Sequence, residues 1–134
     1  MAVFVPQDGE ELALRNFLNA TAPQNQTLRL FVNNITPAET DTAATYTEAT
    51  GGGYASKSLT GANWTFTGTS PTEAAYNAQQ TFTFTGALTT NPTIYGYYLV
   101  QTTSGILMWA ETSTPFTPAN NGDNYNVTPR ITAD

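Results

Sequence analysis

Threonine alternates with aromatic residues along parts of this sequence, and that period-two pattern limits the chain to a narrow set of folds. It is clearest at 81–85, which reads Thr-Phe-Thr-Phe-Thr. Successive side chains of a β-strand point to opposite faces of a sheet, so Phe82 and Phe84 are predicted to face a core while the threonines face solvent. Threonine is β-branched and suits a pleated, half-exposed surface. The pattern therefore predicts a chain that is mainly β.

Other segments carry strand patterns of their own. Residues 27–33 alternate, and residues 93–103 are apolar or aromatic on both faces, which predicts a central strand. Ser104 and Gly105 are predicted to turn this strand tightly into residues 106–111, forming a β-hairpin. Pro129 implies an edge or a bulge in the last strand. Further strands are predicted at 2–5, 54–59, 64–67, 73–85 and 125–131.

One helix is predicted near the N-terminus, over residues 9–19. Glu10 and Glu11 lie in its first turn, where acidic groups complement the helix dipole, and apolar residues follow at helical spacing. With seven or eight strands joined by short turns, the predicted fold is mainly β. It is an antiparallel β-sandwich or jelly-roll-like domain with one short N-terminal helix, and it forms a single domain over residues 1–134.

The segment 34–52 leaves two alternatives open. Part of 42–49 fits either a strand or a helical turn. The three glycines at 51–53 predict either a flexible stretch or a sharp bend, since glycine adopts conformations that other residues avoid.

The surface is predicted to be polar but nearly uncharged. Charged residues make up only 10% of the sequence, less than half of the ~25% usual in soluble domains. Neutral hydroxyls and amides cost far less to desolvate than ions, which favours assembly with a partner. The net charge is −6, and the four basic residues are scattered: Arg15, Arg29, Lys57 and Arg130. We therefore expect no nucleic-acid partner and no membrane partner.

The absence of cysteine excludes disulfides and thiolate metal sites, and it fits assembly inside a cell. Residues 1–8 lack the pattern of a secretory signal, so none is expected. No apolar run approaches the ~20 residues of a membrane helix.

The sequence contains few of the residue types that enzymes use for catalysis, because histidine is also absent. A glycosidase-like acid–base pair is conceivable among the carboxylates, but solvated acids are the ordinary interpretation. Ser56-Lys57-Ser58 is interpreted as a polar strand edge rather than a Ser/Lys catalytic pair. The chain is thus predicted not to be an enzyme and to need no cofactor. The carboxylates considered are Glu10, Glu11, Glu39, Asp41, Glu48, Glu73, Glu111 and Asp123.

Two segments or groups of residues suit a binding site, and each also has a simpler interpretation. Oxygen ligands crowd the segment from Asn120 to Asp123, which suits a hard cation such as calcium, although a plain turn explains the same residues. The aromatic residues suit a platform on which a sugar stacks, although such residues are more often core. They are Trp64, Trp109, Tyr95, Tyr97, Tyr98 and Tyr125.

Three blocks of the sequence stand out: Ile-Tyr-Gly-Tyr-Tyr at 94–98, Gly-Ile-Leu-Met-Trp-Ala-Glu at 105–111 and Val-Thr-Pro-Arg-Ile-Thr at 127–132. In these most specific blocks the sequence resembles a family of small structural proteins of tailed bacteriophages that infect aquatic bacteria, including cyanophages. The Asn-Gly-Asp turn at 121–123 lies between the last two. Earlier blocks that share the resemblance lie at 1–12, 28–33 and 79–84.

The resemblance implies a virion component without catalysis, assembled in the host cytoplasm. The favoured role is a capsid cement or decoration protein that binds the major capsid protein, with self-association, a trimer being favoured. A tail, baseplate or fibre component with a carbohydrate-binding role is the alternative.

Overall fold

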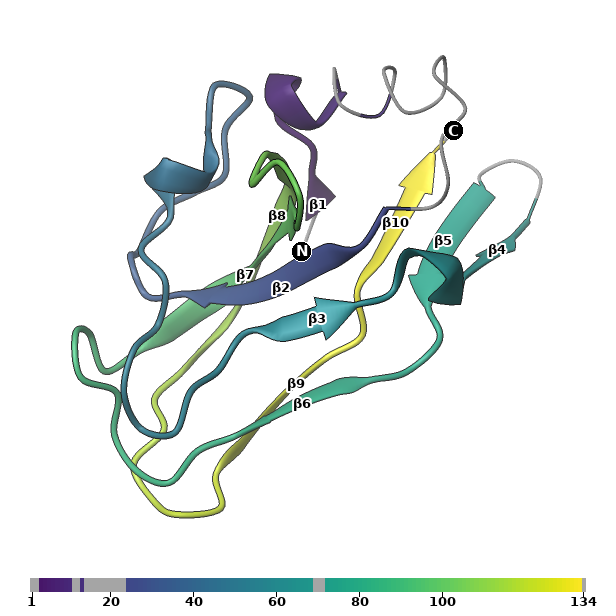
Figure 1. The fold of residues 1–134 in the computed structure, drawn as a ribbon. Helices are drawn as coiled ribbons and strands as arrows, with labels where there is room; N and C mark the ends of the chain where they lie inside the picture. The colour runs from purple at the N-terminus through teal and green to yellow at the C-terminus, as the bar shows by residue number, and fades with distance from the viewer. Residues whose placement is uncertain (1–2, 11–12, 14–23, 69–71, 134) are drawn as a thin grey trace.

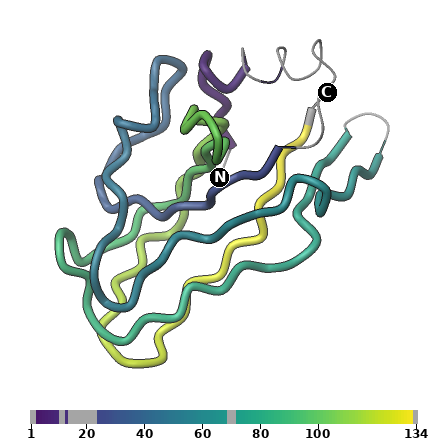
Figure 2. Tube along the Cα trace, viewed as in Figure 1, coloured from purple at the N-terminus to yellow at the C-terminus, as the bar shows by residue number. Residues whose placement is uncertain are grey.

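The structure is a computed structural model that describes residues 3–10, 13, 24–68 and 72–133 (Figures 1 and 2). Its strands and short 3-10 turns follow in the order β1 (Val3–Phe4), β2 (Gln26–Phe31), η1 (Ala43–Thr45), β3 (Lys57–Leu59), η2 (Gly61–Asn63), β4 (Trp64–Thr67), β5 (Thr72–Tyr76), β6 (Gln80–Thr83), β7 (Ile94–Gln101), β8 (Leu107–Phe116), β9 (Asn124–Val127) and β10 (Arg130–Ala133). The protein is mainly β, as predicted. No helix in the described part of the chain is long and apolar enough to cross a membrane.

The expected helix begins two residues earlier than predicted. Residues 7–10 and 13 are helical, and the remainder of 9–19 lies outside the described residues. The carbonyl of Pro6 accepts the N–H groups of both Gly9 and Glu10, which starts the first turn. A Cβ atom at Gly9 would lie 2.2 Å from the carbonyl oxygen of Met108, so glycine lets the helix rest directly on β8.

The largest sheet has five antiparallel strands in the order β1-β8-β7-β2-β3. Strand β7 pairs with β2 on one side and β8 on the other, which confirms that 93–103 holds a central strand. The predicted hairpin is also confirmed, since β7 and β8 pair along most of their length across the turn at Gly105. Strand β8 continues to Phe116, five residues beyond the predicted segment.

The remaining strands form one long antiparallel ribbon with an added edge strand. Strands β6 and β9 pair with each other, and β5 pairs with both β10 and β4. The predicted strands at 73–85 and 125–131 are therefore each split in two. Proline has no N–H to give to a ladder, and Pro129 lies at the break, where its carbonyl accepts the N–H of Tyr76.

The main core lies between the five-stranded sheet and the ribbon. Phe82 and Phe84 are 2% and 0% exposed, and Thr81 and Thr83 beside them are exposed, as the alternation predicts. Figure 1 shows the ribbon of β6 and β9 running beneath β2, β3 and β7. The buried side chains shared by the two layers include Leu28, Leu30, Tyr97, Leu99, Trp109, Phe82, Phe84, Tyr125 and Val127.

A second core lies on the opposite face of the five-stranded sheet. Alternation along β2 and β7 points Phe31 and Tyr98 away from the main core. Tyr46 covers them, with ring centroids 5.0 Å from Phe31 and 5.1 Å from Tyr98. The 3-10 turn η1 delivers Tyr46 to this position, and Glu48 then forms an isolated antiparallel bridge with Phe31, so the segment 42–49 contains both a helical turn and a short β pairing.

Candidate functional site

The candidate acid–base groups are held in separate structural contacts. Asp41 Oδ2 accepts hydrogen bonds from the N–H of Ala38 and the hydroxyl of Tyr46, both at 2.8 Å. Glu111 Oε2 accepts the hydroxyl of Tyr97 at 2.7 Å. Among the described residues, the contacts recorded for these carboxylates join them to phenols or backbone amides and not to one another.

The other candidate carboxylates are placed differently. Glu10 and Glu39 are exposed, and Glu11 lies outside the described residues. Glu73 is paired within the ladders of β5, opposite Thr67 and Thr132. Over the described part of the chain, no three acidic side chains gather into a group that could hold a metal ion.

Ser56-Lys57-Ser58 lies at an edge of the five-stranded sheet, where the polar interpretation placed it. Strand β3 is the terminal strand, and Ser58 stands opposite Thr27 in the ladder. The Lys57 ammonium lies 5.5 Å from the ring centroid of Phe82. The lysine therefore contacts an aromatic face and caps the rim of the main core.

The glycine triplet forms a sharp bend rather than a loose loop. Gly51, Gly52 and Gly53 have φ angles of 79°, 57° and 75°, all in the left-handed region. The carbonyl of Gly52 accepts the N–H of Thr85 at 2.9 Å. The triplet thus fastens the segment that follows β2 to the end of β6.

The segment from Asn120 to Asp123 forms a turn that caps itself. Oδ2 of Asp123 accepts the N–H groups of Ala119 and Asn120, each at 2.8 Å. These hydrogen bonds hold the pKa of the Asp123 carboxyl below its usual value. The carboxylate is therefore engaged by the turn, as the simpler interpretation has it.

The aromatic residues proposed as a sugar platform belong mostly to the cores. Trp109 is 6% exposed, and the half-buried Trp64 packs edge-on against it with ring centroids 5.7 Å apart. The indole N–H of Trp64 donates to Gln26 Oε1 at 2.9 Å. Tyr97, Tyr98 and Tyr125 are also buried, so these rings belong to the cores, as the simpler interpretation expects.

Tyr95, the remaining member, borders a hollow of about 400 Å³. Asn33, Asn34, Asn91 and Thr93 line it as well, giving a rim of neutral amides and a hydroxyl beside one aromatic ring.

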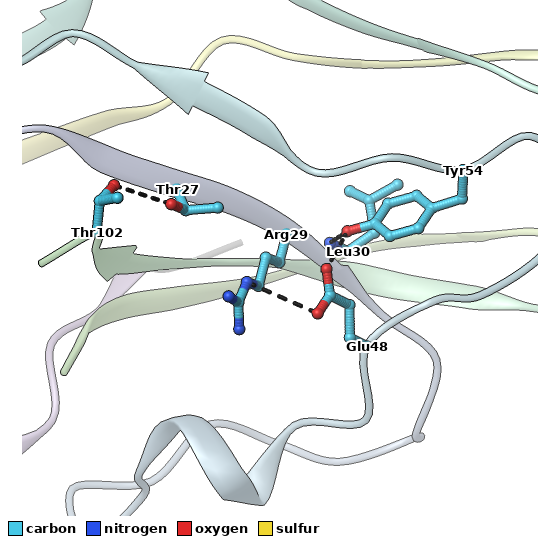
Figure 3. A network of polar contacts seen from close by, with 6 residues as sticks. All are labelled: Thr27, Arg29, Leu30, Glu48, Tyr54 and Thr102. Atoms are coloured by element: carbon cyan, nitrogen blue, oxygen red, sulfur yellow. Dashed lines mark hydrogen bonds and ion pairs between the residues drawn. The ribbon is translucent and has the colours of Figure 1, made fainter. Parts of the chain in front are cut away.

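A polar network joins residues 29–30 of β2 to the segment 48–54 (Figure 3). Tyr54 donates its hydroxyl proton to Glu48 Oε1 at 2.9 Å and accepts the N–H of Leu30 at 3.2 Å. Glu48 Oε2 lies 3.7 Å from Nε of Arg29, which makes an ion pair rather than a hydrogen bond. Burial raises the pKa of the Tyr54 phenol, so the hydroxyl stays protonated and able to donate.

The sequence alone does not indicate this network, because no spacing rule links positions 29, 48 and 54. Strand β3 pairs with β2 only from Gln26 to Leu28. Beyond that point the Tyr54 hydroxyl and residues 47–49 continue along the same edge of β2. The network thus has a structural role, because it holds residues 48 and 54 against the edge of β2.

The exposed surface carries pairs of threonines whose hydroxyls bond to each other. Thr27 pairs with Thr102 at 2.9 Å (Figure 3), and Thr93 pairs with Thr117 at 2.8 Å. A third such bond joins Thr50 to Thr90. These pairs bridge residues far apart in sequence, so they present ordered, neutral hydroxyl groups at the surface.

Strand β4 presents a different surface. Phe66 is 70% exposed at the edge of the three-stranded sheet, and Thr65 and Thr67 on either side are exposed as well. The sequence predicted a strand here but gave no sign that its aromatic residue would face solvent.

Compared with known protein families, with curated proteins and with solved structures, the chain matches none of them.

Proposed function

We propose that this protein is a structural component of a phage virion. Its role is that of a capsid cement or decoration protein, which binds the major capsid protein and stabilises the head without catalysis. The resemblance of blocks 94–98, 105–111 and 127–132 to small virion proteins supports this proposal. These blocks supply most of the β7–β8 hairpin and the break between β9 and β10.

The observation that carries the proposal is the ordered, neutral surface built from threonine pairs. Binding to a large particle requires a surface that is fixed in shape and cheap to dehydrate. A hydroxyl pair such as Thr27–Thr102 is held by its own hydrogen bond, and neutral groups cost far less to bury than ions. With charges at 10% of residues, few ionic groups need be desolvated on contact.

We propose further that the five-stranded sheet and the ribbon are the two layers of a β-sandwich or jelly-roll-like domain. The shared buried side chains from β2 and β7 on one side and from β6 and β9 on the other support this arrangement. Such a body would hold its surface rigid during assembly.

The partners and location follow from the same proposal. The protein would self-associate, with a trimer favoured by symmetric placement on a capsid, and would reside in virions assembled in the host cytoplasm. A net charge of −6 argues against nucleic acid or a membrane surface as a partner.

The test uses purified heads with and without this chain. Heads that lack it are expected to lose their DNA at a lower temperature or after milder osmotic shock, and adding the purified protein back is expected to restore their resistance. Heads that are equally robust without it, with the protein found only on tails, would contradict the proposal.

A tail, baseplate or fibre component with a carbohydrate-binding role is the alternative. The hollow beside Tyr95 favours it, because neutral amides and an aromatic edge are groups that bind sugar hydroxyls and ring faces. Glycan binding that is lost in Tyr95→Ala and retained in the distant Phe66→Ala variant would support this alternative, and glycans that fail to bind the wild-type protein would exclude it.

A further inference from the structure

The outer edge of β4 has no hydrogen-bonded neighbour among the residues that the structure describes. The strand order is β10-β5-β4, so β5 pairs with only one side of β4. Figure 1 shows β4 as the outermost strand at this end of the molecule. Natural proteins usually protect such an edge with charges, proline or a bulge, because a free edge pairs with other chains.

The hydrogen-bond pattern shows which backbone groups face outward. The N–H of Tyr76 donates to Pro129 on the β10 side, and the N–H of Asn77 donates to Asn63 on the β4 side. Tyr76 stands opposite Trp64 in the register. Because hydrogen-bonded and non-bonded pairs alternate in antiparallel ladders, the N–H and C=O groups of Trp64 and Phe66 point away from β5.

The charge pattern around this edge indicates what kind of chain fits it. Residues 58–72 contain no charged residue, although the whole chain carries a net charge of −6. At β4 two copies meet without repulsion, and an oppositely charged partner would find nothing there to recognise.

We propose that β4 pairs antiparallel with β4 of a second copy, about a two-fold axis beside Thr65. Identical antiparallel strands are self-complementary, so each copy gives and receives the same contacts. Trp64 of one copy then stands opposite Phe66 of the other, and the outward N–H and C=O groups of both residues are satisfied. The same register places Phe66, now 70% exposed, on the face that Trp64 of the second copy shares.

The contact is small, which sets the conditions under which it forms. A pair of four-residue strands buries far less than the ~1,200–2,000 Å² of a stable interface. The pair is therefore weak in dilute solution and strengthens when copies are held close together. If the protein also forms trimers, this two-fold contact joins one trimer to another.

A cysteine cross-link tests the register, because the chain has no cysteine of its own. In the proposed register Thr65 faces Thr65 of the second copy as a non-hydrogen-bonded pair, at a Cα separation of about 4.5 Å. That separation suits a disulfide. Concentrated, purified Thr65→Cys protein under mild oxidation is expected to form a disulfide-linked dimer on a non-reducing gel.

Thr67→Cys is the matched control. Thr67 is exposed on the same strand and the same face as Thr65. In the proposed register the two Thr67 positions lie about 14 Å apart along the strands, beyond the ~7 Å limit between Cα atoms in a disulfide. Thr65→Cys is expected to give roughly tenfold or more dimer than Thr67→Cys. Equal yields, or none from Thr65→Cys, would overturn the proposal.

A double variant tests whether the partner at the edge of β4 is the β4 strand of a second copy. Adding Phe66→Lys to Thr65→Cys is expected to lower cross-linking to the level of Thr67→Cys, with circular dichroism and melting temperature little changed. A Phe66→Lys chain that unfolds would show that its own residues cover Phe66, which overturns the proposal. Since these experiments need only the purified chain, they can fail independently of the proposed role on the head.

Discussion

At position 52 the backbone leaves no room for a side chain. Gly52 has a φ of +57°, and a Cβ atom there would lie 2.6 Å from the carbonyl oxygen of Gly86 and 2.9 Å from that of Ala87. Both contacts are with backbone atoms, which cannot turn aside as a flexible side chain would. We predict that Gly52→Ala lowers the free energy of unfolding by about 2–4 kcal/mol, measured by urea denaturation.

Gly105→Ala separates crowding from backbone strain. Gly105 also has a positive φ, +71°, but a Cβ atom would meet nothing within 4 Å. Gly105→Ala is therefore expected to lower the free energy of unfolding only by the cost of placing a residue with a Cβ atom in the left-handed region, about 1–2 kcal/mol. Equal losses in the free energy of unfolding of the two variants would show that the close backbone contacts around Gly52 do not add to the cost of a side chain there.

The burial of residues that follow the alternation of a strand can be predicted from the sequence. The contacts of residues that depend on a segment distant in sequence cannot. Phe82 and Phe84 were assigned to the core because alternation needs only the local sequence. The hydrogen bond from Tyr54 to Glu48 and the exposure of Phe66 depend on how elements meet in space. No pattern in the sequence carries that information.

At the scale of elements, the Tyr54 hydroxyl takes the place of a neighbouring strand. It accepts the N–H of Leu30 where β3 has ended, while its ring stacks on Phe82 with centroids 5.9 Å apart. Tyr54→Phe keeps the ring and leaves a buried N–H without a partner. We predict a loss of about 1–3 kcal/mol in unfolding free energy, measured by urea denaturation.

Tyr46→Phe is the control for this change. The Tyr46 hydroxyl donates to Asp41 Oδ2, which also accepts the N–H of Ala38 and is only half-buried. Water can replace the lost phenol, so a loss of about 0.5–1 kcal/mol is expected. A larger loss in Tyr46→Phe than in Tyr54→Phe would contradict the role assigned to Tyr54 at the edge of β2.

The turn before β9 should make the protein more stable at neutral pH than in acid. The pKa of Asp123 is lowered by the N–H groups of Ala119 and Asn120, so the folded state favours the ionised carboxylate. That contribution is present above the ordinary value of 3.8 and is lost as the pH falls through the lower folded value. Asp123→Ala is expected to show a smaller drop in stability between pH 7 and acid than the wild type, followed by urea denaturation at each pH.

The elements themselves were largely predictable, and their ends were not. The hairpin of β7 and β8 followed from apolar runs on either side of Ser104 and Gly105. The break between β9 and β10 was anticipated from Pro129, but the matching break between β5 and β6 was not. A strand opposite a proline must rearrange its own pairing, and that effect crosses to a segment about fifty residues away in the sequence.

At the scale of the whole molecule, the five-stranded sheet is packed on both faces. The main core lies against the ribbon, and the second core lies under Tyr46 and Ile35 from the segment after β2. The apolar residues on both faces of β7 predicted a central strand. The composition of the Thr- and Ala-rich segment 34–52 did not indicate that this segment would cover the second core. From this segment, the ring of Tyr46 packs on both Phe31 and Tyr98.

Burial of phenols in both cores leads to a prediction about alkaline pH. The pKa values of five tyrosines are raised above the ordinary value of 10.0, with desolvation by burial as the largest cause: Tyr46, Tyr54, Tyr97, Tyr98 and Tyr125. In the unfolded chain these phenols ionise near that value, while in the folded protein they hold their protons. The stability they contribute is therefore complete below pH 10 and is lost as the pH rises further.

These five phenols should ionise together with unfolding rather than one by one. We expect phenolate absorbance to rise steeply above pH 10, at the pH where the β-sheet circular dichroism is lost. Two probes of different groups would then report one transition, because ionising a buried phenol requires opening the core that holds it. Gradual ionisation near pH 10 with unchanged circular dichroism would show instead that water reaches these side chains in the folded protein, and that neither core is sealed.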